Sequence, residues 1–251
     1  MIKSDNKANM NTDNRFRDPI HGFIHLSDIE LKIVDTPEFQ RLRHISQLAL
    51  TNYVYPGANH TRFEHSLGVL ELAGKAFKIL KKKHSRALIK NFKKINLSIK
   101  ESEQLLRFAS LLHDIGHFAF SHAGEAIFSN YKHEEVSKEI ILNSEIANII
   151  KKNCSQEILE YVCMLIIGDE NTLPELRILQ GLISSQLDAD RTDYLIRDSY
   201  HCGVSYGNFD SSRLLESLTI KDMDGEHLEL AIKRGGIHVL ESLILARFFI
   251  F

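Results

Sequence analysis

The chain has 251 residues, of which 43% are hydrophobic and 25% are charged, and its formal net charge is −2. This length and composition are typical of a globular protein with one large core or two small ones. A net charge near zero does not indicate a nucleic-acid partner, and no apolar stretch is long enough to span a bilayer.

The first 17 residues are polar and rich in Asn, Asp and Lys. They lack the apolar centre of a signal peptide, so we expect a disordered lead-in at residues 1–17 and a cytoplasmic protein. The three cysteines, Cys154, Cys163 and Cys202, form no C-x-x-C pair. That sparse set predicts buried free thiols in a reducing compartment.

Residues 18–26 predict a turn that leads into a short strand. Thr36-Pro37 predicts a helix start, because threonine can cap a helix and proline suits its first position. Before a loop at residues 53–60, we expect this helix to bury one face, made by Phe39, Leu42, Ile45 and Leu48.

Two capping boxes predict the next helices. Residues 61–64 form the first box, which places His65 in the first turn of a helix that reaches about Leu80. Residues 98–101 form the second box, which opens an apolar helix that reaches the His113 region. Residues 75–100 hold many lysines and no Asp or Glu. We interpret those lysines as a solvated helix end and loop in preference to a site for nucleotides or nucleic acid.

Four further helices are predicted at residues 130–150, 154–167, 174–187 and 190–200. Residues 226–232 alternate weakly and, with Gly235-Gly236, predict a small hairpin. Residues 239–251 form an apolar helical pattern with no stop signal, so a partner chain or a continuation of the protein should cover this end. We find no linker and predict one domain of the all-α class.

The most informative stretch is Leu111 to His117, which contains His113 and Asp114. A carboxylate inside an apolar helix is costly unless its charge is matched, and a divalent cation held by neighbouring imidazoles would match it. A hydrogen-bonded His–Asp pair at a helix end is the alternative, and it would be the better interpretation of an isolated dipeptide.

Two other segments carry similar chemistry. His65 follows Arg62 at the start of its helix, and taken alone it would be a solvent-facing residue near a cap. Residues 188–198 place Asp190, Asp193 and Arg197 at helical spacing. Taken alone, this pattern favours an exposed helix with an ion pair between Asp193 and Arg197.

Together these segments resemble a known family. Residues 18–22, 35–43, 62–68, 113–122 and 187–194 appear in the order found in the HD-domain deoxynucleoside triphosphate triphosphohydrolases, the relatives of the sterile-alpha-motif and HD-domain protein. The resemblance covers residues 18–251. It implies an HD-domain helical bundle with a small β-hairpin element, and a phosphohydrolase that cleaves dNTPs to deoxynucleoside and triphosphate.

The resemblance also implies roles for individual residues. One divalent metal, Mn, Fe, Zn, Ni or Mg, would be held by His65, His113, Asp114 and Asp190. A metal-activated water would attack the α-phosphorus, and His122 would protonate the leaving oxygen. The catalytic group would be His117, His122, Glu125 and His133. Substrate would be bound by Gln47, Leu48, Arg62, Arg191, Tyr194 and Asp198. A guanine-nucleotide activator would contact Asp35, Gln40 and Arg43, although a solvated helix face explains these three equally well.

The sequence departs from the family pattern in two places. Phe118-Ala119 stands where the family often has Gly-Pro. Family members also continue beyond the position of Phe251, with further phosphate and sugar contacts, so we expect a domain truncated at its C-terminal end. The apolar end predicts a homo-oligomer.

Two alternative functions stay open. The first is a weakly active or inactive nucleotide-binding or assembly module of the same fold. The second is another HD phosphohydrolase. A cyclic-dinucleotide phosphodiesterase would carry a G-Y-P stretch, which is absent here, and an alarmone hydrolase fits residues 62–66 and 188–194 less well.

Overall fold

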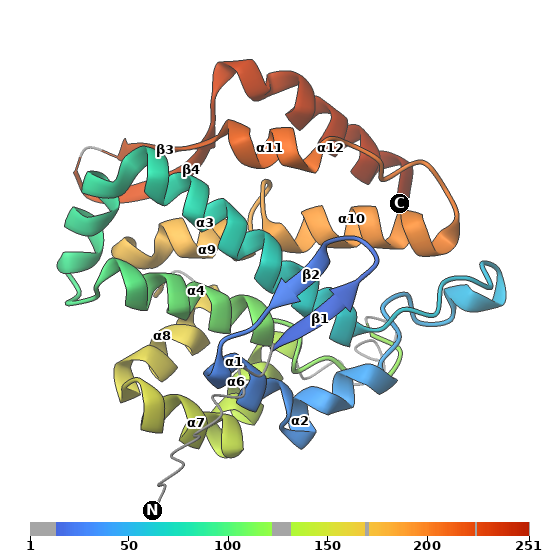
Figure 1. Ribbon diagram of the computed structural model, residues 1–251, viewed down its shortest axis with the longest axis horizontal. Coiled ribbons are helices and arrows are strands. Elements are labelled where there is room, and N and C mark those ends of the chain that lie inside the picture. The colour runs from blue at the N-terminus through green and yellow to red at the C-terminus, as the bar shows by residue number, and fades with distance from the viewer. Residues whose placement is uncertain (1–13, 122–131, 169–170, 224, 251) are drawn as a thin grey trace, which may run out of the picture.

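The computed structural model describes residues 14–121, 132–168, 171–223 and 225–250 (Figure 1). In this described part the chain is helical apart from two antiparallel hairpins, β1–β2 and β3–β4. The all-α class with a small β element is therefore confirmed. None of the described helices is long and apolar enough to cross a membrane.

The first hairpin pairs β1 (Arg15–Asp18) with β2 (Gly22–His25). The Asp18 carboxylate accepts the backbone N–H groups of Ile20 and His21, at 2.9 and 2.8 Å, and this fixes the turn. β2 confirms the predicted strand. β1, however, begins inside the segment predicted to be disordered, so that expectation was wrong for residues 15–17, while residues 1–13 lie outside the described part.

Helix α1 (Asp28–Val34) was not predicted, although Ser27 and Glu30 form a capping box at its start. Helix α2 (Pro37–Gln40) begins as predicted, with Thr36 as its cap. The expected helix through Leu48 was wrong, because a 3-10 turn, η1 (Arg41–His44), follows α2 and the chain is extended at Ile45. A second 3-10 turn, η2 (Thr51–Tyr53), lies in the next loop.

Both capping boxes of the central helices are confirmed, in α3 (Arg62–Lys93) and α4 (Ile99–Leu112). α3 continues past the predicted end at Leu80 and bends at His84, where the backbone is not helical. The extension forms because Leu88 and Phe92 are fully buried and prolong the apolar face. In Figure 1 α3 runs through the middle of the molecule, and it contacts α4, α9, α10, α11 and β3.

The second half of the chain surrounds this pair. It comprises α6 (His133–Asn143), α7 (Glu145–Asn153), α8 (Gln156–Ile167), η3 (Pro174–Leu176), α9 (Arg177–Ile183) and α10 (Ala189–Cys202). One helix predicted over 130–150 is divided, because Ser144 leaves α6 and caps α7. α10 ends at Gly203 as predicted, in a left-handed conformation with φ of 69° that favours glycine.

The last elements are α11 (Ser211–Ser217), β3 (Leu218–Met223), β4 (His227–Ile232), η4 (Arg234–Gly236) and α12 (Ile237–Ile250). β4 confirms the predicted strand, but its hairpin partner is β3, which was not predicted, and Gly235-Gly236 lie in η4 and not in the hairpin turn. α12 packs on α10 and α11 through Val239, Leu243 and Ala246. Its opposite side is exposed, and Phe248 is 75% accessible to solvent, so the predicted apolar surface is present at this end.

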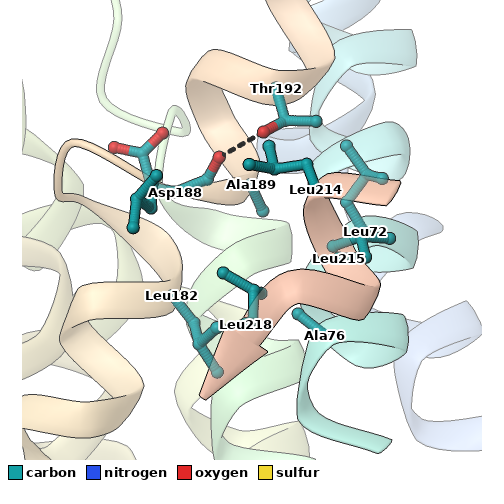
Figure 2. A pocket seen from close by; sticks show the side chains of 10 residues that line it. Leu72, Ala76, Leu182, Asp188, Ala189, Thr192, Leu214, Leu215 and Leu218 are labelled. Carbon is teal, nitrogen blue, oxygen red and sulfur yellow. Dashed lines mark hydrogen bonds between the residues drawn. The ribbon is translucent and has the colours of Figure 1, made fainter. Parts of the chain in front are cut away.

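Helix α10 begins over an apolar layer that fixes its first turn. Figure 2 shows Leu72 and Ala76 of α3 beside Leu182, Leu214 and Leu218, around an internal space of about 10 Å³. A space of that size holds one water at most, so the layer is close-packed. The carboxylates at the start of α10 are therefore held on a rigid base.

Close packing of α10 on α3 also requires a glycine. A Cβ at Gly68 would lie 1.9 Å from Asp193 Oδ1 and 2.5 Å from Arg197 Nη2. Helix propensity favours alanine over glycine by about 1 kcal/mol, but overpacking a core costs about 1–3 kcal/mol and here also displaces a buried ion pair. We expect Gly68→Ala to lower the midpoint of urea unfolding.

Gly181→Ala in α9 is the matched control for this prediction, because its Cβ would meet nothing closer than Leu230 Cβ at 3.3 Å. A Gly68→Ala protein as stable as the Gly181→Ala protein would contradict the importance of this contact.

Candidate functional site

Most of the predicted site residues line one cavity of about 380 Å³ between α3, α10 and the turn that follows α4. A volume of this order suits a small-molecule ligand. Ten of the predicted residues line it, namely Gln47, Leu48, Arg62, His113, Asp114, His117, His133, Asp190, Tyr194 and Asp198. Sequence reasoning did not anticipate the remaining part of the wall, which is formed by Glu134, Leu165, Ile166, Ile183 and Ser184.

The prediction that Asp114 lies inside a helix was wrong. α4 ends at Leu112 and Asp114 lies in the turn beyond it, although its side chain is buried as expected. The guanidinium of Arg41 holds this turn by donating to the carbonyl oxygens of Ile115 and His117. Carbonyl oxygens at the end of a helix lack backbone N–H donors, and here the Arg41 side chain supplies the hydrogen bonds.

Gly116 allows α6 to approach this turn. Its Cβ would lie 2.1 Å from the His133 carbonyl oxygen, and its backbone N–H donates to Ser137 Oγ at 2.9 Å. The close approach brings the His133 ring onto His117, with ring centroids 4.0 Å apart and planes 18° apart. Glycine is therefore required at position 116 because a larger residue would keep α6 away from this turn.

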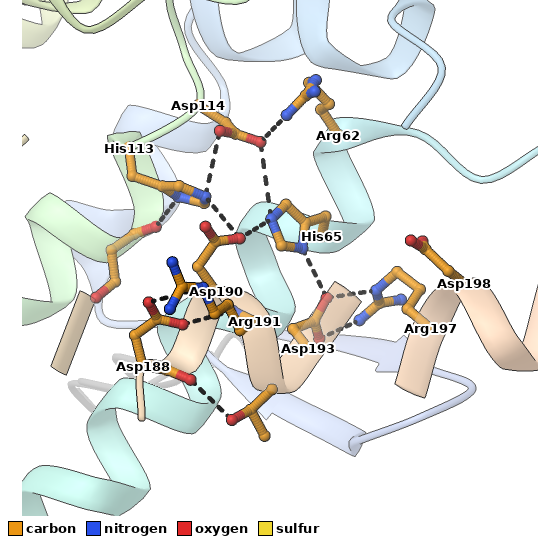
Figure 3. Close-up of polar contacts among 12 residues, drawn as sticks. Arg62, His65, His113, Asp114, Asp188, Asp190, Arg191, Asp193, Arg197 and Asp198 are labelled. Carbon is orange, nitrogen blue, oxygen red and sulfur yellow. Dashed lines mark hydrogen bonds and ion pairs between the residues drawn. The ribbon is translucent and has the colours of Figure 1, made fainter. Parts of the chain in front are cut away.

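Three of the four predicted metal ligands form a compact donor cluster. One ligand atom each from His65, His113 and Asp190 lies within 4.8 Å of the other two (Figure 3). Asp190 Oδ1 lies 3.0 Å from His65 Nε2 and 3.8 Å from His113 Nε2. Both ring nitrogens are buried without a hydrogen-bond partner among the described residues. Two imidazoles and a carboxylate form a donor set that fits a divalent metal.

The fourth predicted ligand, Asp114, lies beside this cluster. Its Oδ1 is 3.3 Å from His113 Nε2, and its Oδ2 is 3.7 Å from His65 Nε2 and pairs with the Arg62 guanidinium. Burial opposes its ionisation, but Arg62, His113 and His117 hold the pKa of Asp114 well below its usual value. It is therefore an ionised carboxylate at the edge of the donor set.

The cluster favours a positive charge at its centre. Burial opposes a charged ring at His65, but its close contacts with the Asp190 and Asp193 carboxylates outweigh burial and raise the pKa of His65 to about 10. A metal ion meets the same negative field once His65 loses its proton. Metal binding and protonation therefore compete for this imidazole.

Asp193 orients the ring of His65. His65 Nδ1 lies 2.8 Å from Asp193 Oδ2, so Nδ1 carries the hydrogen and Nε2 is left facing the cluster (Figure 3). Arg197 donates to both oxygens of Asp193, at 2.7 and 2.9 Å, and also to Asp18. His21 Nε2 approaches the same carboxylate at 2.5 Å. The β1–β2 hairpin is thus tied to the donor cluster through buried charges.

Two of the four expected catalytic residues, His117 and His133, lie in the described part of the chain. Burial lowers the pKa of His117 to about 4, so its ring is neutral at pH 7, and its Nε2 lies 3.4 Å from Asp114 Oδ1. His133 stacks on His117 and borders the cavity. His122 and Glu125 lie outside the described residues.

The expected substrate-binding residues are not all at the cavity. Arg191 is absent from its wall, and its guanidinium donates to the Ser185 carbonyl and to Gln186 Oε1. Tyr194 lines the cavity, and burial raises its pKa to about 12. Arg62 also lines it, with Nε donating to Ser121 Oγ at 3.0 Å.

The three residues considered for an activator lie outside this cavity. Gln40 Oε1 accepts from Arg43 Nε at 2.7 Å, and the Arg43 guanidinium stacks over the Phe63 ring. Asp35 is exposed at the end of α1 and borders a separate surface hollow. Gln40 and Arg43 are therefore in direct contact, through the hydrogen bond between their side chains.

Comparisons with known proteins show what the chain is similar to. The HD domain family profile matches residues 62–198. A protein of Methanocaldococcus jannaschii is 40% identical over 231 residues, which are 92% of this chain and 43% of that protein. Deoxynucleoside triphosphate triphosphohydrolase SAMHD1 of Mus musculus is 34% identical in an alignment of 238 positions, which covers 83% of this chain and 34% of that protein.

A solved structure shows a similar fold. The crystal structure of a phosphohydrolase from Bacteroides thetaiotaomicron superposes with a TM-score of 0.76 at 34% identity, over 94% of this chain and 53% of that one. The chain thus spans about half, or less, of the length of these relatives.

Proposed function

Because the chain belongs to the HD-domain phosphohydrolase family, we propose that it hydrolyses deoxynucleoside triphosphates to deoxynucleoside and triphosphate. The observation that carries this proposal is the cluster of His65, His113 and Asp190, because His113 and Asp190 line one cavity together with Arg62 and Asp198. The mouse relative, named for that reaction, supports the choice of substrate.

The groups around the cavity are suited to a nucleotide. A divalent metal held by His65, His113, Asp190 and the adjacent Asp114 would supply Lewis acidity and an acidified water. The guanidinium of Arg62 would bind phosphate oxygens, and a guanidinium binds such oxygens well. Tyr194 keeps its proton at neutral pH and can donate a hydrogen bond.

Proton transfer would fall to the histidines near the cluster. The neutral His117 can accept a proton, and its stacking on His133 holds its ring in place. From the family resemblance we propose His122 as the acid that protonates the leaving 5′ oxygen, with Glu125 or His133 orienting its ring. Gln47 and Asp198 would bind the sugar 3′-hydroxyl, with Leu48 packed against the sugar.

We expect metal-loaded protein to release triphosphate from at least one of the four dNTPs. Each dNTP is incubated with protein loaded with Mn²⁺, Fe²⁺, Zn²⁺, Ni²⁺ or Mg²⁺, and the products are separated by anion-exchange chromatography. Deoxynucleoside and triphosphate in equal amounts would support the proposal. Monophosphate with pyrophosphate, or binding without turnover, would instead favour another HD phosphohydrolase or a nucleotide-binding module.

Two proposals about partners rest on surfaces of the chain. The exposed apolar side of α12, with Ile244, Leu245, Phe248 and Phe249 more than half exposed, suits contact with a second copy. A guanine-nucleotide activator at Gln40 and Arg43 rests on the family resemblance alone.

A further inference from the structure

His60 occupies an unusual position beside the cavity. Its side chain is fully buried just before α3, and its Nε2 lies 2.8 Å from Asp198 Oδ1. A carboxylate can only accept, so the ring donates through Nε2. Nδ1 is buried without a hydrogen-bond partner among the described residues.

The backbone of the same residue holds Gln47. The His60 carbonyl accepts the Gln47 N–H at 3.1 Å, and the adjacent residues Ser46 and Thr61 form a β-bridge. Gln47 and Asp198 both line the cavity, and Gln47 Oε1 is buried there without a hydrogen-bond partner in the described part of the chain. One residue thus fixes two polar side chains of the cavity wall that come from different elements.

Packing leaves the His60 ring little freedom. It stacks on His201 of α10, with ring centroids 4.4 Å apart and planes 17° apart. Gly57 brings the loop close to α10, since a Cβ there would lie 2.4 Å from the His201 carbonyl oxygen. Rotation of the ring away from Asp198 would therefore require the loop to separate from α10.

We propose that His60 is a positioning residue that makes this site selective for a sugar 3′-hydroxyl, acting through Asp198 and Gln47. The inference rests on the proposed function and deepens it. With Oδ1 held by His60, Asp198 keeps Oδ2 to accept the hydroxyl hydrogen, and the Gln47 side-chain N–H can donate to the hydroxyl oxygen. A nucleotide without the hydroxyl leaves these buried groups unpaired, which is the strongest basis for discrimination by a site.

Two substitutions separate the hydrogen bond from the stacking. His60→Phe keeps a ring against His201 but has no donor for Asp198. His60→Gln carries an amide nitrogen that can reach Asp198 but has no ring. The measurement is the ratio of kcat/KM, and of binding affinity, for a dNTP and its 2′,3′-dideoxy analogue with metal-loaded protein.

We expect the wild type to prefer the 3′-hydroxyl by at least about tenfold. His60→Phe should bring this ratio close to one with unchanged metal content, and His60→Gln should restore part of it. His201→Phe is the matched control, because it keeps the stacked pair and the bond from His60 to Asp198. It should therefore retain the preference.

The outcomes distinguish the inference from the proposed function. Wild type that hydrolyses dNTPs, paired with a His60→Phe protein of equal selectivity, overturns the inference and leaves the function standing. Wild type that hydrolyses a dNTP and its 2′,3′-dideoxy analogue equally well also overturns the inference and leaves the function standing. Failure of the wild type both to bind and to hydrolyse dNTPs overturns the two together.

A further measurement covers the case in which His60→Phe does not fold. The ¹⁵N resonances of the histidine side chains are then recorded for the wild type with each nucleotide. The dNTP should shift the His60 Nε2 resonance more than its dideoxy analogue does. Equal shifts would overturn the inference.

Discussion

Asp193→Asn is expected to destabilise the fold by about 3–5 kcal/mol, the usual cost of removing one partner from a buried ion pair. Asp193 and Arg197 are both fully buried, and Asp18 would be the one counter-charge left to Arg197 among the residues that the structure describes. The free energy of unfolding, measured in urea at pH 7, tests this expectation.

A surface pair provides the matched control. Glu103 lies 3.1 Å from Lys81, and both side chains are partly exposed. Pairs of this kind contribute between zero and about 1 kcal/mol, so Glu103→Gln should have little effect. Equal losses of stability in the two variants would contradict a special role for the buried network.

The effect of Asp193→Asn should also depend on pH. Burial would raise the pKa of Asp193, but Arg197 and the hydrogen bonds from His21 and His65 hold it well below its usual value. Because the pKa is lower in the folded state, the carboxylate stabilises the fold above about pH 4, and this contribution is lost as the pH falls through the folded-state value. The stability difference between wild type and variant should therefore shrink in acid.

His113→Ala is expected to lose stoichiometric metal and at least about 100-fold in hydrolysis rate, because it removes a donor from the His65, His113 and Asp190 cluster. Asp193→Asn keeps all the metal-binding side chains and changes only the residue that orients His65. The metal affinity of this variant should therefore fall by about 10–100-fold. Elemental analysis after dialysis gives the occupancy of each variant.

His238→Ala is the control for the metal measurement. Its side chain is 91% exposed on α12, and its ring lies beside Glu241. This variant should keep the metal content of the wild type. Full occupancy in His113→Ala protein would remove His113 from the metal site.

Local signals allowed the elements nearest the site to be predicted from sequence. The capping boxes before α3 and α4 correctly placed His65 and the start of the helix that leads to His113, because capping depends on neighbouring residues. The end of α4 was not predicted. The contact that supports the turn after it comes from Arg41, more than 70 residues earlier in the chain.

Long-range contacts explain the other errors at the site. The i,i+4 spacing of Asp193 and Arg197, taken alone, favoured a surface ion pair, yet both are buried, because α3 and the β1–β2 hairpin cover them. His60 gave no signal in the sequence, since its partner Asp198 lies 138 residues away. Residue type and spacing predict donors, but tertiary packing decides which partner each one meets.

The central claim is that the cluster of His65, His113 and Asp190, with Asp114 beside it, holds the divalent metal on which phosphohydrolysis depends. The most direct measurement is a titration of metal-free protein with Mn²⁺, following bound metal and triphosphate release from dNTPs in the same samples. We expect both to rise together and to saturate at one metal per chain. Hydrolysis that persists in the metal-free protein, or one bound metal per chain with no hydrolysis of any dNTP, would contradict the claim.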